Sequence, residues 1–255
     1  MKNNNMKMKI SVCVATYNGG DFIKAQLQSI LKQLSYNDEI IISDDGSTDE
    51  TISIISSFSD ARIRLIHNDS SYLKSIKSSR SYQVTKNFEN ALAYATGEYI
   101  FLSDQDDVWE DGKVTGCISL LKGEKCNLVV HDATVVDESD NVIMPSYFRK
   151  INAKKGFFRN IIKNSYLGCC MVFDRSVLLQ ALPFPQNLIA HDMWIGLVAE
   201  KIGKVVFVEK KYIRYKRHSA AVTASGMKSD NSLNFKIYYR VQFFFQYVKK
   251  LFLIN

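Results

Sequence analysis

Three aspartates stand within four residues in the segment FLSDQDDVW, where Asp104, Asp106 and Asp107 follow one apolar run and precede another. Like charges this close repel each other unless something positive lies among them. Closely spaced carboxylates are the oxygen ligands that a hard divalent cation prefers, and in nucleotide sites such a cation is shared with substrate phosphates. The spacing therefore indicates a site for Mg²⁺ or Mn²⁺. The alternative is a solvated acidic turn in which Asp107 caps the next helix.

A second acidic segment, DDGSTD, covers residues 44–49. Asp45 can accept hydrogen bonds from the edge of a nucleotide base, and Gly46 permits close approach of a ligand. The same residues can also be turn and cap chemistry, with Ser47 or Thr48 capping a helix. Neither acidic segment has EF-hand spacing, and the chain has no Walker A or GxGxxG sequence, so calcium-loop, P-loop and dinucleotide sites are not indicated.

Both acidic segments directly follow predicted β-strands. Apolar, β-branched runs predict strands over 9–15, 39–43, 62–66 and 98–103, with helices between them and a long loop over 68–82. This alternation predicts a parallel sheet with helices on its faces. Ligands of such sheets bind at the carboxyl ends of the strands, where both acidic segments lie.

The pattern after residue 110 is less regular. We expect this half to extend the same sheet and to cover its ligand edge, with Trp109 as a core residue that holds the acidic turn. The predicted strands are 128–136, 141–144, 171–173, 204–208 and 212–215, and the predicted helices are 157–163, 176–182 and 193–201.

Composition limits the class of protein. A chain of 255 residues with 46% hydrophobic residues and three prolines suits one large α/β domain without long linkers. The net charge of +7 favours an anionic partner: nucleic acid, an acidic membrane surface or a phosphorylated small molecule. Five cysteines without a CxxC pair indicate a reduced, cytoplasmic protein. We predict neither a signal peptide nor a membrane span.

Taken in order, these segments resemble family 2 glycosyltransferases of the GT-A fold, in particular the bacterial rhamnosyl- and galactosyltransferase-like members. The motifs that carry the resemblance span about residues 8–218 and read SVCVATYNGGDFI, DEIIISDDGSTDET, NFENALAYATGEYIFLSDQDDVW, GCCMVF, HDMWIGLVAE and YKRH. The resemblance implies a mostly parallel central sheet flanked by helices. It implies one catalytic domain over 1–230, with a nucleotide-binding half over 8–110 and an acceptor half over 111–230.

The resemblance also implies an activity. A family member moves a sugar from a nucleoside-diphosphate sugar, here a UDP- or dTDP-sugar, to a hydroxyl of a glycan or lipid-linked acceptor. Such enzymes serve bacterial surface polysaccharide synthesis and use Mn²⁺ or Mg²⁺. Inverting transfer needs one base for the acceptor hydroxyl and positive charge near the departing diphosphate.

Donor-binding roles follow residue by residue from the same resemblance. Asp45 would face the base, Asp104 would lie near the ribose, and Asp106 would hold the metal with help from Asp107. The nucleoside pocket would be lined by Ala15, Thr16 and Tyr17.

Catalytic and acceptor roles are implied in the same way. Asp192 would be the catalytic base, and Arg217 and His218 would lie where the C-terminal segment closes over the diphosphate. His218 can also ligate the metal or stabilise a turn. The residues assigned to a sugar or acceptor pocket are Asp132, Gly168, Cys169 and His191.

Two of these aspartates have a plainer interpretation. Asp192 precedes a predicted helix and can be an N-cap only, in which case the field of the helix end would lower its pKa and weaken it as a base. Asp132 stands on a predicted strand, where structural hydrogen bonding is the main expectation.

Residues 235–254 have the pattern of a basic amphipathic helix within a C-terminal segment over 231–255. Aromatic residues with a basic opposite side are typical of helices that bind membranes peripherally, here at the inner face of the cytoplasmic membrane. Packing on the body or against a second copy is the alternative. The predicted apolar face consists of Ile237, Val241, Phe244, Phe245, Val248, Leu251 and Phe252.

Other functions are weighed against this one. A sugar nucleotidyltransferase would carry a GxGTR-like loop after the first strand, where this chain has ATYNGG. A nucleic-acid-binding protein would need an exposed basic and aromatic face, and the acidic ligand edge argues against it. A non-catalytic nucleotide-sugar-binding relative differs from the enzyme only in turnover.

Overall fold

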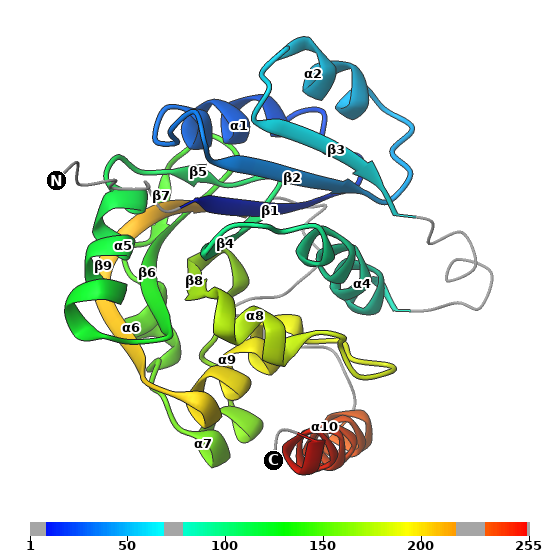
Figure 1. The fold of residues 1–255 in the computed structure, drawn as a ribbon, viewed down its shortest axis with the longest axis vertical. Helices are drawn as coiled ribbons and strands as arrows, with labels where there is room; N and C mark the ends of the chain where they lie inside the picture. Colours follow the sequence, from blue (N-terminus) through cyan, green and yellow to red (C-terminus); the bar gives the residue numbers. More distant parts are fainter. Residues whose placement is uncertain (1–8, 69–78, 218–232, 254–255) are drawn as a thin grey trace, which may run out of the picture.

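The computed structural model describes residues 9–68, 79–217 and 233–253, with the backbone alone for 233–236 and 251–253 (Figure 1). Within these residues a single nine-stranded sheet runs through both halves of the chain, as predicted. Its order is β3 (Ile63–His67), β2 (Glu39–Asp44), β1 (Ile10–Thr16), β4 (Tyr99–Asp104), β8 (Met171–Asp174), β6 (Leu128–Val136), β9 (Val205–Lys216) and β5 (Val108–Trp109), with β7 (Val142–Met144) beside β6.

Strand direction differs between the two halves of the sheet. The four strands β1 to β4 are parallel, as the strand–helix alternation predicted. In the second half β8 is antiparallel to both β4 and β6, whereas β6 and β9 are parallel. The sheet is therefore mixed, and the mostly parallel arrangement holds only for its first half.

Strand β9 corrects the prediction of two strands over 204–208 and 212–215. The charged residues Glu209, Lys210 and Lys211 suggested a break, but β9 is continuous. Its pairing with β6 steps from His131↔Val208 to Asp132↔Lys211, so a bulge accommodates the extra residues. The charged side chains are exposed there and do not interrupt the strand.

Helices cover both faces of the first half (Figure 1). Helix α1 (Ile23–Leu31) and helix α2 (Thr51–Ser57) lie on one face, and helix α4 (Arg80–Ala93) packs against β1 and β2 on the other. Ser79 caps α4 by accepting a hydrogen bond from Tyr82 N. The predicted loop over 68–82 is thus wrong for its last residues, because this cap starts a helix; residues 69–78 lie outside the described part.

Helix α9 (His191–Ile202) lies at the centre of the second half and buries the seven consecutive residues from Met193 to Ala199. Such an all-round apolar helix belongs in a core. The other helices of this half are α5 (Lys113–Glu124), α6 (Tyr147–Ile151), α7 (Phe157–Ile162) and α8 (Arg175–Ala181), with a 3₁₀ turn over Gly168–Cys170.

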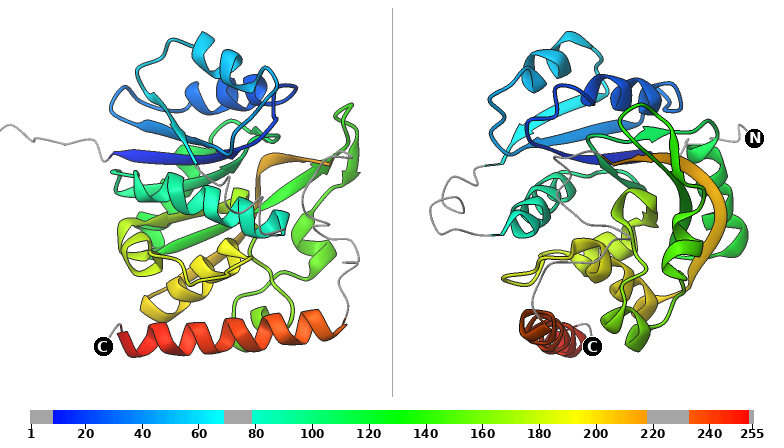
Figure 2. Two further views of the ribbon diagram at one scale, coloured as in Figure 1. Left: turned by 90° about the vertical axis from the view of Figure 1, so that its right-hand side faces the viewer. Right: turned by 180° about the vertical axis from the view of Figure 1, so that it is seen from behind.

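The C-terminal helix α10 (Leu233–Leu253) confirms the predicted helix and lies along the outside of α7 and α9 (Figure 2). Phe243 and Tyr247 are buried against Trp194 of α9, with ring centroids 5.9 and 6.2 Å from its ring. None of the helices in the described ranges is long and apolar enough to cross a membrane.

Candidate active site

Strand register brings the two acidic segments to one edge of the sheet. Thr16 is paired with Asp44 on β2, and Ala15 is paired with Asp104 on β4. The carboxyl ends of three parallel strands therefore meet there, as the strand pattern predicted.

Gln105 ties the ends of β1 and β4 together, a role that sequence reasoning missed. Its Oε1 accepts hydrogen bonds from Thr16 Oγ1 (2.7 Å) and from Tyr17 N (2.8 Å), and its Nε2 donates to Tyr17 O (3.2 Å). A Cβ on Gly19 would lie 2.5 Å from Gln105 Oε1, so only glycine leaves room for this contact. The side chain of Tyr17 is nearly half exposed and available to a ligand.

The acids of the first segment are engaged locally. Asp44 is buried and accepts hydrogen bonds from Gly46 N (3.0 Å), Ser47 N (2.9 Å) and Ser47 Oγ (2.5 Å). Asp49 accepts from Thr51 N and Gly20 N, both at 3.0 Å. Partial burial would raise the pKa of Asp49, but these hydrogen bonds and one from the Thr51 hydroxyl outweigh it and lower the pKa.

Ser47 and Thr48 do not cap α2, contrary to one of the two predictions for this segment. The helix begins at Thr51, its N-cap is Glu50, and no side chain makes the cap hydrogen bond. Asp45 is 5% exposed and accepts a hydrogen bond from Asn68 Nδ2 (3.0 Å). Its contact with a nucleotide base stays a prediction.

In the second acidic segment, Asp107 is buried and only one of its two carboxylate oxygens has a hydrogen-bond partner among the described residues. Asp107 is 1% exposed, and its Oδ1 accepts a hydrogen bond from Lys216 N (3.1 Å). Its Oδ2 is buried without a hydrogen-bond partner among the described residues. Helix α5 begins at Lys113 with Gly112 as its N-cap. Asp107 is therefore neither a solvated turn residue nor a cap, which rules out that alternative.

Crowded carboxylates shift the pKa of the acids in this segment. Burial raises the pKa of Asp104 to about 7, and the charges of Asp106 and Asp192 add to the effect. Burial and the neighbouring charges of Asp106 and Asp104 also raise the pKa of Asp107 well above its ordinary value. Both groups therefore take up protons more readily than ordinary carboxylates do, and a bound cation would favour their ionised forms.

The geometry of this cluster suits a divalent metal ion. Ligand atoms of Asp104, Asp107 and Cys169 lie within 4.8 Å of one another. The two carboxylates fit Mg²⁺ or Mn²⁺, whereas a thiol sulfur is a softer donor than these ions prefer. Asp106 is half-buried and outside the three-residue group, so its role as a metal ligand stays a prediction.

A buried lysine lies next to these acids. Lys113 is 0% exposed, its Nζ donates to Cys169 O (2.7 Å), and it lies 4.2 Å above the ring centroid of Trp109. Burial lowers the pKa of Lys113, and the charge of Asp107 opposes that shift. Nothing in the sequence marks this lysine, because lysines are normally exposed. Trp109 is a core residue, as predicted.

Asp192 lies in the first turn of α9 and is not its cap. The N-cap is Ala190, and Asp192 Oδ2 accepts a hydrogen bond from Asn164 Nδ2 (3.3 Å). Burial raises the pKa of Asp192 to about 6, although hydrogen bonds from Met193 N and Asn164 oppose it. The expectation that the helix end would lower this pKa is wrong, because burial dominates. A base with this pKa is ionised at neutral pH and still accepts a proton readily.

Three further groups surround Asp192. Burial and the charge of Asp192 both raise the pKa of Tyr147 and of Tyr239, so these hydroxyls lie within its field. A Cβ on Gly168 would lie 3.9 Å from Asp192 Cβ and 3.2 Å from His191 Nε2. A side chain at this position would therefore crowd the His191 ring and be in ordinary contact with Asp192.

His191 is held as a neutral ring. It stacks on Phe88 with centroids 4.3 Å apart and approaches Thr85 Oγ1 at 3.4 Å. Burial lowers the pKa of His191 to about 3, so the imidazole is uncharged at neutral pH.

Asp132 is structural in this fold. It is 1% exposed and accepts hydrogen bonds from Ala133 N (2.8 Å), Phe148 N (2.8 Å) and Ser146 Oγ (2.5 Å). These bonds occupy both carboxylate oxygens, in line with the structural interpretation of this residue. They leave little capacity for an acceptor.

Arg217 follows β9 and donates its main-chain N–H to Val136 O (2.8 Å). Its guanidinium lies 5.8 Å from the ring centroid of Tyr215, and its charge acts on Tyr147, which is also in the field of Asp192. His218 lies outside the described residues.

Comparison with known proteins identifies the family and the fold. The family model "Glycosyl transferase family 2" matches residues 11–181. The UDP-Glc:alpha-D-GlcNAc-diphosphoundecaprenol beta-1,3-glucosyltransferase WfgD of Escherichia coli is 27% identical over 192 residues, which are 75% of this chain and 70% of WfgD.

Two solved structures share the fold. TarS 1-349 of S. aureus in complex with UDP-GlcNAc has a TM-score of 0.65 and 17% identity over 95% of this chain and 73% of that chain. The mannosyltransferase PcManGT of Pyrobaculum calidifontis, in complex with GDP-Man and Mn2+, has a TM-score of 0.55 and 19% identity over 79% of this chain and 54% of that chain. This chain thus spans about half to three quarters of the length of these solved proteins. Its fold is of the GT-A type, and the chain belongs to glycosyl transferase family 2.

Proposed function

We propose that this chain is an inverting, metal-dependent glycosyltransferase that moves a sugar from a nucleoside-diphosphate sugar to an acceptor hydroxyl. The observation that carries the proposal is the position of Asp192. Its charge acts directly on Asp104, so the candidate base and the cation-binding acids share one buried site. Transfer needs these two parts side by side, since the hydroxyl loses its proton as the diphosphate departs.

Asp192 accepts the proton of the acceptor hydroxyl in this proposal. Asn164 orients one of its oxygens, and Gly168 lies next to Asp192 without a side chain of its own. The hydroxyl oxygen attacks the anomeric carbon from the side opposite the diphosphate, which inverts the configuration at that carbon. The pKa of about 6 leaves Asp192 ionised and ready at neutral pH.

Donor binding falls to the edge built by β1, β2 and β4. Tyr17 offers an exposed ring to the nucleoside beside Ala15 and Thr16, and Asp45 offers a carboxylate to the base. Asp104 and Asp107 would hold the divalent cation, with Asp106 close by. Bound there, Mn²⁺ or Mg²⁺ would neutralise charge on the departing diphosphate. Arg217 contributes a positive charge near Tyr147, whose hydroxyl is also in the field of Asp192.

The acceptor proposed here is a lipid-linked glycan at the cytoplasmic face of a bacterial membrane, for surface polysaccharide synthesis. The name of the E. coli relative, which includes diphosphoundecaprenol, supports a lipid-linked acceptor. The solved complexes with UDP-GlcNAc and GDP-Man support a nucleotide-sugar donor. All five cysteines are buried and free, which suits a reducing compartment.

The test is Asp192→Asn. We expect transfer to fall by about 10² to 10⁴-fold while donor affinity stays within about threefold, because the amide cannot take the proton yet keeps the shape. Transfer and donor binding would be measured with Mn²⁺ and a panel of UDP-galactose, UDP-glucose, UDP-N-acetylhexosamines and dTDP-rhamnose. Asp111→Asn, at an exposed carboxylate, is the matched control. Normal turnover by Asp192→Asn would reject Asp192 as the base, and a wild type that binds donors without turnover would be a non-catalytic relative.

A further inference from the structure

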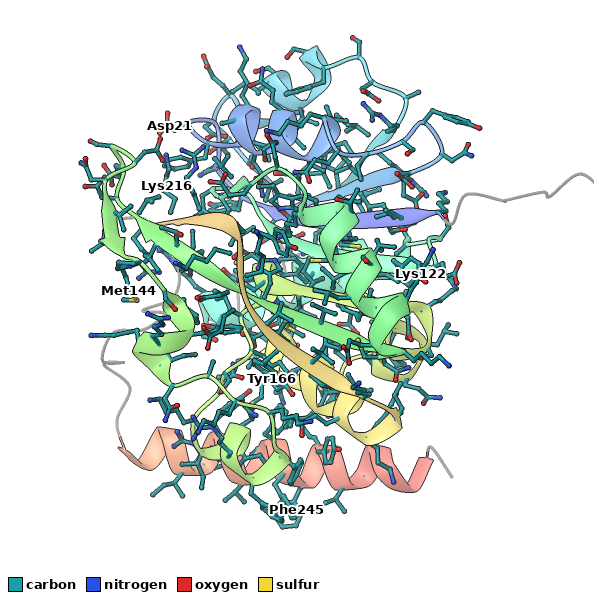
Figure 3. All side chains as sticks on the ribbon, turned by 90° about the vertical axis from the view of Figure 1, so that its left-hand side faces the viewer. Asp21, Lys122, Met144, Tyr166, Lys216 and Phe245 are labelled. Carbon is teal, nitrogen blue, oxygen red and sulfur yellow. The ribbon has the colours of Figure 1, made fainter. Side chains whose placement is uncertain are left out.

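The face of α10 that points away from the body is its apolar face. Contacts with the body come from Tyr239, Phe243 and Tyr247, and from polar residues: Arg240 donates to Ile161 O and Ile162 O, and Lys250 donates to Leu182 O. Burial of these residues fixes the rotation of the helix. Four residues of the predicted apolar face are exposed: Ile237, Val241, Phe244 and Phe245. Phe245, at 66% exposure, points away from the body in Figure 3.

Helix α7 extends this apolar face. Phe158 is 78% exposed and Ile162 is 69% exposed, and Phe157 joins the two helices with its ring centroid 6.3 Å from that of Phe244. We name the whole surface the α7–α10 face. Its exposed apolar side chains are Phe158, Ile162, Ile237, Tyr238, Val241, Phe244 and Phe245. Contiguous exposed aromatics of this extent mark an interaction surface.

The two segments that form the α7–α10 face carry basic side chains and no acidic ones. The sequence has six Lys and Arg and no Asp or Glu from residue 141 to residue 173, and four Lys and Arg and no acid from residue 231 to residue 255. Lys154, Lys155 and Lys163 are exposed beside α7. The nearby Glu200 of α9 is turned inward, where it accepts hydrogen bonds from Gly156 N (2.7 Å) and the Tyr166 hydroxyl.

We propose that the α7–α10 face docks on an anionic lipid bilayer. Aromatic side chains among lysines match the boundary between acyl chains and anionic headgroups. A second copy of the chain is a poorer occupant, because pairing this face with itself would bring two sets of lysines together. In this proposal α10 lies on the membrane surface and does not cross it, because its other face packs against the protein.

Docking would place the reaction beside the bilayer. The inner face of α10 carries Tyr239, whose hydroxyl is buried without a hydrogen-bond partner among the described residues and lies in the field of Asp192. One helix thus borders both the candidate catalytic base and the proposed lipid surface. The inference rests on the proposed lipid-linked acceptor for its purpose, but lipid binding is measurable without any sugar transfer.

Co-sedimentation of the full chain with sucrose-loaded vesicles tests the proposal. With about 30 mol% phosphatidylglycerol in phosphatidylcholine we expect binding that weakens in about 0.5 M NaCl and is at least about tenfold weaker to pure phosphatidylcholine. The double variant F158S/F245S and the triple variant K154E/K155E/K163E should each lose at least about tenfold in affinity. All five side chains are exposed, so melting temperature and circular dichroism should match the wild type.

Matched controls lie elsewhere on the surface. Tyr36→Ser changes an aromatic residue that is 84% exposed, and Lys122→Glu changes an exposed lysine of α5, away from α10 in Figure 3. Both should bind vesicles like the wild type. Equal binding by F158S/F245S, or no wild-type binding to anionic vesicles, would overturn the proposal. A dimer in light scattering that F245S dissociates, without vesicle binding, would make the face an interface between copies. If the wild type binds vesicles but transfers no sugar to a soluble acceptor, the proposed function would be rejected and the lipid-docking proposal would stand.

Discussion

Two acidic loops leave neighbouring parallel strands at the same edge of the sheet, and they use the same residue type in opposite ways. In the loop after β2, Asp44 and Asp49 accept hydrogen bonds from local donors, and the pKa of Asp49 is lowered. In the loop after β4, Asp107 is buried, and within the described part of the chain one of its oxygens has no hydrogen-bond partner. The pKa values of Asp104 and Asp107 are raised.

The contrast separates a structural acid from a functional one. The carboxylates of the first loop stabilise the fold on their own, because hydrogen bonds favour their charged form. Those of the second loop carry a cost at neutral pH that a bound cation would remove. Acid content alone therefore does not identify the metal site; burial without sufficient partners does.

The largest expected difference between the loops is in activity. Asp107→Asn should lower the rate of transfer by about 100-fold or more, because a neutral amide is a weaker ligand than a carboxylate and would hold the cation less firmly at the diphosphate. Asp49→Asn should keep the rate within about threefold, since its hydrogen bonds are structural. Steady-state rates at saturating Mn²⁺ would compare the two. Equal losses would mean that the first loop also takes part in catalysis.

The pH dependence of stability should also separate the loops. Asp104 has a pKa of about 7 when folded, above its ordinary 3.8, so its contribution to stability is fully present below pH 3.8 and is lost as pH rises through 7. With chelator present, we expect the melting temperature to fall by at least about 3 °C from pH 5 to pH 8 relative to Asp104→Asn. Mn²⁺ should raise the melting temperature more at pH 8 than at pH 5. An Mn²⁺ effect that does not change with pH would remove Asp104 from the metal site.

Lys113 is the positive charge that the second loop has and the first loop lacks. Lys113→Met keeps the apolar stem and removes a positive charge that would repel a bound cation. The pKa of Asp107 should rise further, but a doubly charged ion gains more than a proton does, so Mn²⁺ should bind about tenfold more tightly at pH 8. Lys122→Met, on the exposed side of the same helix, is the control. Calorimetric titration with Mn²⁺ would measure both. An unchanged affinity would show that Lys113 supports packing through Cys169 and Trp109 only.

The smallest expected effect is on the free energy of unfolding, which should change in opposite directions in the Asp107 and Asp49 variants. In cation-free protein at pH 8, Asp107→Asn should stabilise the fold, because folding of the variant requires neither a buried charge nor the uptake of a proton at this position. Asp49→Asn should destabilise the fold by about 1 kcal/mol through the lost charge-assisted hydrogen bonds. Urea denaturation of both variants gives the two free energies of unfolding. Destabilisation of the same sign in both would contradict the proposed difference between the loops.

Much of the fold follows from local patterns. Short β-branched runs and helical spacing of apolar residues predicted the parallel strands β1 to β4, and the acids at their carboxyl ends predicted the edge that carries the site. The pattern failed at β9, where the charged residues 209–211 suggested a break, and at residues 80–82, which begin α4. In both places pairing or packing with remote segments outweighed the local preference of a few polar residues.

By itself, the sequence determined the parallel strands of the first half, the placement of Asp45, Asp104 and Asp107 at their carboxyl ends, and the amphipathic character of α10. Only the tertiary structure decided which acids lack partners, that Lys113 is buried beside them, that the pKa of Asp192 is raised, and that the apolar face of α10 points to solvent. Periodicity and turn chemistry are properties of neighbouring residues. Burial and pKa depend on which distant segments pack together, and that is set by the folded chain as a whole.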